Sequence, residues 1–245
     1  MRDGENIRQV AELGVDWIGM IFWDKSPRNV TMIPTYAGII PDRAPASSVP
    51  DGSPASSVPG GFPVSSVRGG FPAGAPKRVG VFVDEMPQNI ITRVVNFQLD
   101  LVQLHGHETP TLIRNLRRTL DPDIRPGIKF IKAINIATAA DLAVCSDYAD
   151  CVDYFLFDTR ATVPAGSPAG SALPGGSGQQ FDWSVLAGYA GETPFLLSGG
   201  IGPDDVERVR TFHHPKCIGI DLNSRFETAP ALKDIQKLKS ILEQL

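Results

Sequence analysis

The chain has 245 residues, a formal net charge of −4 and a hydrophobic content of 42%. This length suits one large α/β domain, residues 1–245, with a sizeable core. The acidic balance gives no electrostatic support for nucleic-acid binding. No apolar run approaches the roughly 20 residues that span a bilayer, and no signal peptide opens the sequence. We therefore expect a cytoplasmic protein with neither nucleic-acid nor membrane partners.

Short apolar segments alternate with helix-like segments along the chain. The apolar segments are rich in β-branched and aromatic residues, as strands buried on both faces should be. Such alternation predicts a parallel sheet with helices outside it. The expected strands are Trp17–Phe22, Arg78–Val83, Leu99–His105, Lys129–Asn135, Tyr154–Asp158, Pro194–Ser198 and Cys217–Leu222. The expected helices are Glu5–Leu13, Gln88–Asn96, Thr111–Leu120, Ala137–Tyr148, Trp183–Tyr189, Asp204–Phe212 and Ala231–Leu245.

The strand count predicts a (β/α)8 TIM barrel that lacks one strand. Seven strands are found, the sequence opens on a helix, and a closed barrel of this kind needs eight. We expect the missing first strand to precede Met1. The strands Trp17–Phe22 and Cys217–Leu222 would then border an open seam and expose unpaired backbone groups.

Two Pro/Gly/Ser-rich inserts interrupt the alternation. Residues 45–75 carry a nine-residue repeat that begins at Pro45, Pro54 and Pro63. Residues 162–176 have a similar composition and follow the strand Tyr154–Asp158. Segments of this kind bury too little apolar area to offset their ordering entropy, so we expect mobile loops within the single domain. A binding role for the repeat is the alternative.

The last two strands each end abruptly in small polar residues. Phe195–Gly202 reads FLLSGGIG, and Ile218–Arg225 reads IGIDLNSR. Glycine lets bare backbone N–H groups approach an anion, and the loops after strands seven and eight of a barrel commonly bind phosphate. The pair of loops predicts a site for a small phosphorylated substrate. The alternative for each loop is a simple left-handed turn.

Three ionisable side chains occur at the predicted carboxyl ends of other strands. They are Arg28, His105 and Asp158, and the carboxyl ends of barrel strands meet on one rim. An arginine, a histidine and a carboxyl group beside two anion loops suit acid–base chemistry on an anionic substrate. Taken singly, each has a structural alternative: a surface charge, a satisfied strand-end histidine and a turn cap.

This ordered set resembles the phosphoribosylanthranilate isomerase family of tryptophan biosynthesis. The matching pieces are Lys25–Arg28, Lys77–Val83, Gln103–Gly106, Phe157–Thr159, Gly175–Gly178 with Phe181–Trp183, Leu197–Gly200, and Gly219–Ser224 with Glu227. The resemblance implies an Amadori rearrangement that converts N-(5-phosphoribosyl)anthranilate to 1-(2-carboxyphenylamino)-1-deoxyribulose 5-phosphate. It implies no cofactor and no metal, and a monomer or a homodimer.

The resemblance also implies roles for particular residues. Asp158 matches the general acid, and Arg28 and His105 match residues on the anthranilate side of the site. The remaining substrate-binding matches, mostly in the phosphate loops, are Gly176, Gly178, Gly199, Gly200, Asp221 and Ser224.

Two departures from the family pattern stand out. Arg225 replaces the usual glycine after the serine of the last loop. The family also begins with a strand of the form Lys-(Ile/Val)-Cys-Gly, whose cysteine is the general base, and we expect that segment before Met1. Cys145, Cys151 and Cys217 do not replace it by position, and they have no CxxC spacing that would indicate a disulfide framework or a zinc site.

Two other functions stay open at the level of sequence. One is a barrel remnant that binds a phosphorylated ligand without turnover. The other is a different barrel enzyme of the same pathway, such as indole-glycerol-phosphate synthase. The latter is weakened because no strand-end lysine is set in a clear acid–base array, and Lys132 alone does not supply one.

Overall fold

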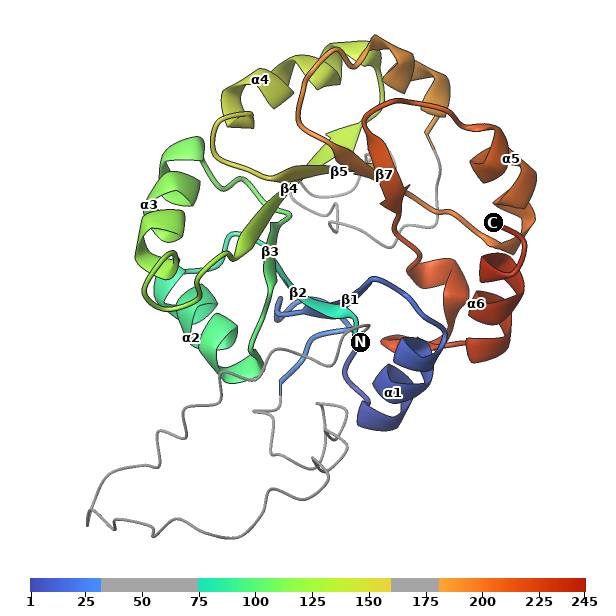
Figure 1. Ribbon diagram of the computed structural model, residues 1–245, viewed down its shortest axis with the longest axis horizontal. Helices are drawn as coiled ribbons and strands as arrows, with labels where there is room; N and C mark the ends of the chain where they lie inside the picture. The colour runs from blue at the N-terminus through green and yellow to red at the C-terminus, as the bar shows by residue number, and fades with distance from the viewer. Residues whose placement is uncertain (32–74, 160–180) are drawn as a thin grey trace, which may run out of the picture.

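The computed structural model describes residues 1–31, 75–159 and 181–245 (Figure 1). The second Pro/Gly/Ser-rich insert, 162–176, lies outside the described residues, as does nearly all of the first, 45–75. Gly176 and Gly178 lie there as well. The expectations for these segments therefore stay predictions.

Seven parallel strands form one curved sheet with a ring of helices outside it (Figure 1). The strand order along the sheet follows the order in the sequence, β1 to β7. Each of the seven predicted strands is present, and most are slightly shorter than expected. Their bounds are β1 Trp17–Ile21, β2 Lys77–Phe82, β3 Leu101–Leu104, β4 Lys129–Ile136, β5 Tyr154–Thr159, β6 Phe195–Leu197 and β7 Cys217–Ile220.

The strands bury both faces, which is why they read as continuous apolar runs. One face contacts the helices through a large core that contains the fully buried Phe82, Phe130 and Phe155. The other face lines the barrel interior, where Leu101 and Ile131 belong to a small separate cluster. Every residue of β3 is buried. The sheet is thus of the (β/α) barrel type.

The first three helices follow the start signals in the sequence. The Asp3 carboxylate caps the first of them by accepting from the Asn6 N–H at 2.7 Å. Thr109 caps the third, and Pro110 occupies its first turn, where no N–H is needed. The bounds are α1 Gly4–Glu12, α2 Pro87–Phe97 and α3 Pro110–Leu120.

Three of the later helical predictions are wrong in part. The predicted helix Ala137–Tyr148 begins at Ala139, with a 3-10 segment, η1 Ala139–Val144, before α4 Cys145–Tyr148. Its side-chain cap explains the start, because the Asp141 carboxylate accepts from the N–H groups of Ala137 and Thr138. The predicted helices Trp183–Tyr189 and Asp204–Phe212 appear as η2 Trp183–Gly188, and as η3 Pro203–Asp205 with α5 Val206–Thr211.

The predicted helix Ala231–Leu245 is the larger error. Its first residues belong to a β-hairpin, β8 Glu227–Ala229 and β9 Leu232–Lys233, and the helix is α6 Ile235–Leu242. Ala231 adopts the left-handed conformation in the turn, with φ of 70°. The Asp234 carboxylate then caps α6 at the Lys237 N–H. Periodicity missed the hairpin because its strands are only two or three residues long.

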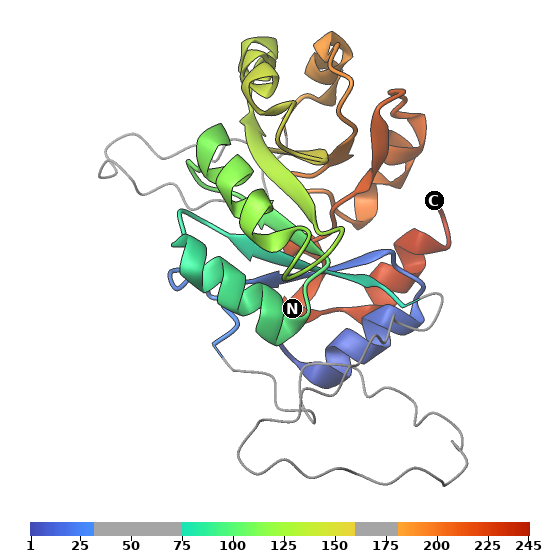
Figure 2. The same ribbon diagram turned by 60° about the vertical axis from the view of Figure 1, so that its left-hand side comes forward.

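The two end strands of the sheet face each other across a seam. Within residues 1–31, 75–159 and 181–245, β1 pairs with β2 and β7 with β6, and no ladder joins β1 to β7. The free edge of β1 is partly occupied, since the Met1 amino group donates to the Gly19 carbonyl and the Val30 N–H donates to the Ile21 carbonyl. Outside the seam, α1 and α6 lie side by side in both views (Figures 1 and 2).

Candidate active site

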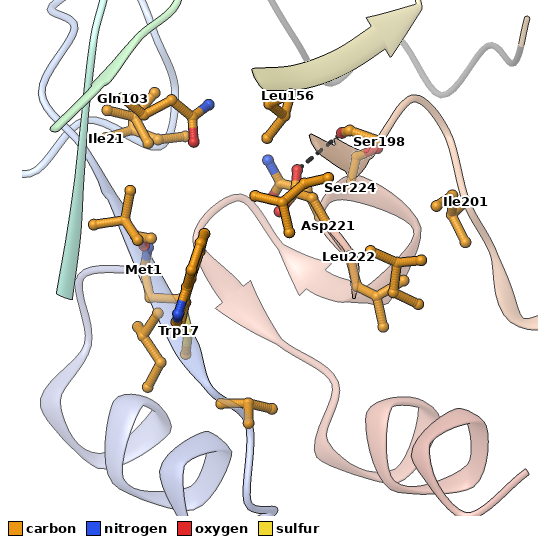
Figure 3. Close-up of a pocket in the computed structure, with 18 of the residues that line it drawn as sticks. Met1, Trp17, Ile21, Gln103, Leu156, Ser198, Ile201, Asp221, Leu222 and Ser224 are labelled. Carbon is orange, nitrogen blue, oxygen red and sulfur yellow. Dashed lines mark hydrogen bonds between the residues drawn. The ribbon is translucent and has the colours of Figure 1, made fainter. Parts of the chain in front are cut away.

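A cavity of about 620 Å³ extends through the barrel interior to the carboxyl ends of the strands. This size suits a small-molecule site. In Figure 3, Gln103 and Ile21 lie on one wall, and Ser198, Asp221 and Ser224 lie together on the facing wall. All the predicted site residues that the structure describes line this cavity: Arg28, His105, Asp158, Gly199, Gly200, Asp221 and Ser224.

Asp158 and His105 lie together in the cavity at the ends of β5 and β3. Both side chains are buried, and His105 Nε2 is 3.4 Å from Asp158 Oδ2. The Gln103 amide nitrogen lies 3.3 Å from His105 Nδ1. With the amide donating, Nδ1 is the acceptor, and Nε2 faces the Asp158 carboxyl. The Thr159 N–H donates to the other carboxyl oxygen of Asp158, Oδ1, at 2.8 Å. Asp158 is therefore fixed in place with Oδ2 toward the histidine.

A second carboxyl group faces Asp158 from the end of the sheet. The Ser198 hydroxyl donates to Asp221 Oδ2 at 2.9 Å, as Figure 3 shows. Burial raises the pKa of Asp221, and the nearby Asp158 carboxylate adds to this effect, against the opposing attraction of Lys233. Raised carboxyl pKa values in a cavity are typical of acid–base sites.

The loop after β6 approaches the end of β5 so closely that only glycine fits. Gly199 has φ of 91° and Gly200 has φ of 66°, both left-handed. A Cβ at Gly199 would lie 2.2 Å from Thr159 Oγ1 and 2.8 Å from the Thr159 nitrogen. Successive backbone N–H groups in such a turn form a concave site for an anion. Ser224, at the start of η4 Ser224–Phe226, lines the same cavity from the β7 loop.

Arg28 forms an ion pair with the buried carboxylate of Glu227, on the other side of the seam. Its Nε lies 3.0 Å from Glu227 Oε1 and 2.8 Å from Oε2, and its terminal NH2 group lies 2.7 Å from Oε2. Lys233 Nζ lies 3.7 Å from Glu227 Oε1. These three side chains are almost enclosed, with exposed fractions of 16%, 5% and 9% for Arg28, Glu227 and Lys233. Together they form a charge network between the β1 and β7 loops.

Lys132 is occupied by a structural ion pair on the other side of the barrel. Its Nζ lies 2.9 Å from Glu108 Oε2 and donates to the carbonyls of Leu104 and Gly106, at 3.3 and 2.6 Å. Glu108 in turn accepts from the N–H groups of Asp84 and Gly106. The lysine thus fixes the loop around His105.

The three cysteines lie away from Asp158 and His105. Cys145 begins α4 and is buried, and burial raises the pKa of its thiol to about 12. Burial also raises the pKa of Cys151 and Cys217. A thiol with a raised pKa forms less of the thiolate, which is the species that acts as a base or a nucleophile. Within residues 1–31, 75–159 and 181–245, no group of three or more His, Cys, Asp or Glu side chains could hold a metal ion.

Sequence reasoning missed several residues that shape this site. Gln103, Ser198 and Glu227 stood in the matched pieces without a role, and Lys233 was not singled out. Gln103 had a usable signal, because it precedes His105 by two residues and so shares its face of the strand. Lys233 had none, since its segment was expected to be helical.

Fold and cavity together are of the class of parallel (β/α) barrel proteins, with buried carboxyl and imidazole side chains beside a glycine turn at the carboxyl ends of the strands. The model of the family "N-(5'phosphoribosyl)anthranilate (PRA) isomerase" matches residues 66–244. An N-(5'-phosphoribosyl)anthranilate isomerase of Parabacteroides distasonis is 40% identical over 245 residues, which cover 100% of this chain and 90% of that protein. The enzyme of the same name from Phocaeicola vulgatus is 36% identical, covering 100% of this chain and 94% of that one.

Solved structures agree with these relatives in fold. The crystal structure of a phosphoribosyl anthranilate isomerase from Thermus thermophilus has a TM-score of 0.67 and 22% identity, covering 100% of this chain and 94% of that chain. A phosphoribosyl anthranilate isomerase in complex with reduced 1-(o-carboxyphenylamino)-1-deoxyribulose 5-phosphate has a TM-score of 0.65 with the same identity and coverage. The chain belongs to the N-(5′-phosphoribosyl)anthranilate isomerase family, a family of tryptophan-biosynthesis enzymes.

Proposed function

We propose that this cavity catalyses the Amadori rearrangement of N-(5′-phosphoribosyl)anthranilate, with Asp158 as the general acid. The acid protonates the ribose ring oxygen as the aminal opens. A general base then removes the C2′ proton of the Schiff base, and the resulting enol-amine becomes a ketone. Both steps are proton transfers between the substrate and side chains, so the proposal requires no cofactor.

The observation that carries this proposal is the position of the buried Asp158 carboxyl. It shares one cavity with Arg28 and with the Gly199–Gly200 turn. A substrate with a carboxylate at one end and a phosphate at the other needs cationic or N–H donors at both ends and an acid between them. We assign Arg28 and His105 to the anthranilate end. Gly199, Gly200 and Ser224 are assigned to the phosphate, with Asp221 beside them.

The remaining phosphate contacts are proposed from the family resemblance alone. Gly176 and Gly178 match the family's third phosphate loop but lie outside the described residues. Arg225 lies against the glycine loop, since a Cβ at Gly202 would be 2.7 Å from its Cδ.

By the family resemblance, the general base is proposed to be the cysteine of a Lys-(Ile/Val)-Cys-Gly strand, and the seam between β1 and β7 is where such a strand would pair. Among residues 1–31, 75–159 and 181–245 no ladder joins β1 to β7, and this supports the assignment, since paired edges would leave no room for another strand. The raised pKa values and remote positions of Cys145, Cys151 and Cys217 support it as well. A cysteine at the carboxyl end of that strand would face Asp158 across the cavity.

The assembly and location of the protein stay proposals of a coarser kind. We propose a monomer or a homodimer that works in the cytoplasm on a small phosphorylated molecule. One similar solved structure is of monomers generated from a dimeric phosphoribosylanthranilate isomerase of Thermotoga maritima. No helix among residues 1–31, 75–159 and 181–245 is long and apolar enough to cross a membrane.

The test compares the 245-residue chain with a form extended before Met1 by a strand that ends in Lys-Val-Cys-Gly. In the extended form, Asp158→Asn should lower kcat by ~10²–10⁴ and change KM little, because the proton moves only in the transition state. Asp150→Asn, at an exposed position, is the matched control. Near-normal activity of extended Asp158→Asn would remove Asp158 from the role of acid. Full activity of the unextended chain would exclude a base in the eighth strand.

A further inference from the structure

The charge network across the seam contains one carboxylate that contacts both halves of the site. We propose that Glu227 is a positioning residue that couples the anthranilate end of the substrate to the phosphate end. It does so by orienting Arg28 directly and the Leu222–Ser224 loop through Lys233. This inference rests on the proposed function, because it takes the two ends from that assignment.

The first half of the argument is the geometry of Arg28. Glu227 engages the Nε and one terminal nitrogen of the guanidinium in the two-pronged arrangement that fixes the plane of an arginine. Arg28 and Glu227 both line the cavity. An arginine held on one edge presents its other terminal nitrogen in a fixed direction, which is what recognition of a planar carboxylate requires.

The second half is the position of the Lys233 ammonium. Its Nζ donates to the Leu222 carbonyl at 3.1 Å, to the Asn223 carbonyl at 2.9 Å and to the Asn223 side-chain oxygen at 2.9 Å. These acceptors immediately precede Ser224, in the loop assigned to the phosphate. Lys233 thereby sets the path of the backbone that presents Ser224 to the cavity.

Glu227 stabilises the charge of that ammonium, whose Nζ lies 3.7 Å from Glu227 Oε1. Burial lowers the pKa of Lys233, and Glu227 is the strongest influence that opposes this shift, ahead of Asp221. The β8–β9 hairpin places the two residues directly opposite each other, Glu227 against Lys233. The Ala231 N–H in the turn of that hairpin donates to Glu227 Oε1 at 3.3 Å. Loss of the negative charge would therefore disturb the lysine, the loop and the arginine together.

If Glu227 had only a structural role, its substitution would lower the stability of the chain without weakening ligand binding at both ends of the site. The network also joins α1 to β9, since Lys233 exchanges two hydrogen bonds with Asn6, so substitutions in it are expected to lower stability in any case. A measurement of stability therefore does not test the coupling. Measuring the binding of inorganic phosphate and of anthranilate separately does test it, because each probe occupies only one end of the site.

The experiment titrates the full chain with inorganic phosphate and, separately, with anthranilate. Amide shifts of Gly200 and Ser224 report the first, and the Arg28 Nε–H resonance reports the second. Glu227→Gln should weaken both ligands by at least about fivefold, the lower end of typical coupling between sites. Lys233→Met keeps the Glu227–Arg28 pair and should weaken phosphate alone. Glu192→Gln, whose side chain is 91% exposed, is the control and should change neither.

Each result separates the inference from the function that it rests on. If the unsubstituted chain binds neither probe, the proposed site is wrong and the inference falls with it. If the unsubstituted chain binds both probes and Glu227→Gln binds them equally well, only the coupling role of Glu227 is overturned. If Glu227→Gln does not fold, Lys233→Met still decides, because unchanged phosphate binding in that variant contradicts the proposal. Glu227→Asp, which keeps the charge but is one methylene shorter, should recover part of the loss.

Discussion

In both the closed wall of the barrel and its seam, a buried lysine near a glutamate holds a rim loop by donating to backbone carbonyls. By closed wall we mean strands β2–β6, and by seam the edges of β1 and β7 with the loops that follow them. In the closed wall, buried Lys132 pairs with Glu108 and binds two backbone carbonyls around His105. In the seam, buried Lys233 lies near Glu227 and binds two carbonyls before Ser224. In both places a buried ammonium fixes the loop that carries a candidate site residue.

The difference between the two lies in what surrounds the ion pair. The closed wall already has ladder hydrogen bonds between all neighbouring strands, so Lys132 and Glu108 add to a rigid frame. In the seam no ladder joins β1 to β7 within the described residues, and side chains make the connection: Arg28 to Glu227, and Asn6 to the Lys233 backbone. Polar side chains can thus hold a barrel together where its sheet does not, which ties the integrity of the site to a few residues.

The largest difference in unfolding free energy is expected between the variants Lys132→Met and Lys233→Met. Lys132→Met leaves Glu108 without its cation at a position where the carboxylate side chain is 1% exposed. Breaking such a pair costs about 3–5 kcal/mol of unfolding free energy. Lys233→Met should cost less, about 1–3 kcal/mol for its unmatched carbonyl acceptors, because Glu227 keeps Arg28 as a partner. Urea unfolding measures both. Equal losses of unfolding free energy in the two variants would contradict the idea that Arg28 compensates for the missing lysine in the seam.

The next comparison concerns two glycines with similar backbone angles. Gly199 in the closed wall has φ of 91°, and Gly14 in the turn before β1 has φ of 79°. A methyl group at Gly14 meets nothing within 4 Å, whereas at Gly199 it meets Thr159 at 2.2 Å. Both alanine variants share the left-handed strain, so Gly199→Ala should be less stable than Gly14→Ala by about 1–3 kcal/mol from the clash. It should also lose phosphate binding, which titration would show; binding retained at Gly199→Ala would argue against this turn as the anion site.

A smaller effect is expected where α1 meets the hairpin. The Asn6 side chain donates to the Lys233 carbonyl at 2.9 Å and accepts from the Lys233 N–H at 2.7 Å. Asn6→Ala removes both, at about 1 kcal/mol for each hydrogen bond. Asn115→Ala in α3 is the control, because that side chain is exposed and the gain in helix propensity is the same. Thermal unfolding of the two variants would show whether this contact helps to hold the seam.

The last comparison is one of pH dependence, between Asp153 in the closed wall and Asp221 in the seam. Burial alone would raise the pKa of Asp153, but hydrogen bonds from Arg117, Lys129 and the Phe130 N–H outweigh it and lower the value below 3.8. Asp153 therefore contributes stability above that pH, and the contribution is lost as the pH falls through the lowered pKa. Burial raises the pKa of Asp221, so its ionised form costs stability near neutral pH, and the cost disappears as the pH falls through the raised pKa.

The corresponding variants should differ in sign. Asp153→Asn should lower the urea midpoint near neutral pH and flatten its decline in acid, whereas Asp221→Asn should raise the midpoint near neutral pH. A series of urea curves across the acid range measures both. If Asp221→Asn destabilises the chain at neutral pH, the raised pKa of that carboxyl is not a sign of strain in the folded state.

The sequence by itself determined most of the architecture. All seven strands could be predicted because strands buried on both faces are continuous apolar runs, and that signal is local. Asp158, His105, Gly199 and Gly200 could be nominated because strand ends in a parallel barrel meet on one rim, so their order along the chain already gives their position in space.

Only the tertiary structure decided which partners these residues have. Glu108 and Lys132 are 24 positions apart, and Arg28 and Glu227 are 199 apart. Pairing over such distances leaves no periodic trace in the sequence. The hairpin that carries Lys233 is too short for an alternating pattern, and it exists because Glu227, Asn6 and the Asp234 cap hold its ends. The helices and strands follow from local burial patterns. The electrostatics of the site depend on contacts that form only when the strands and their loops assemble into the tertiary structure.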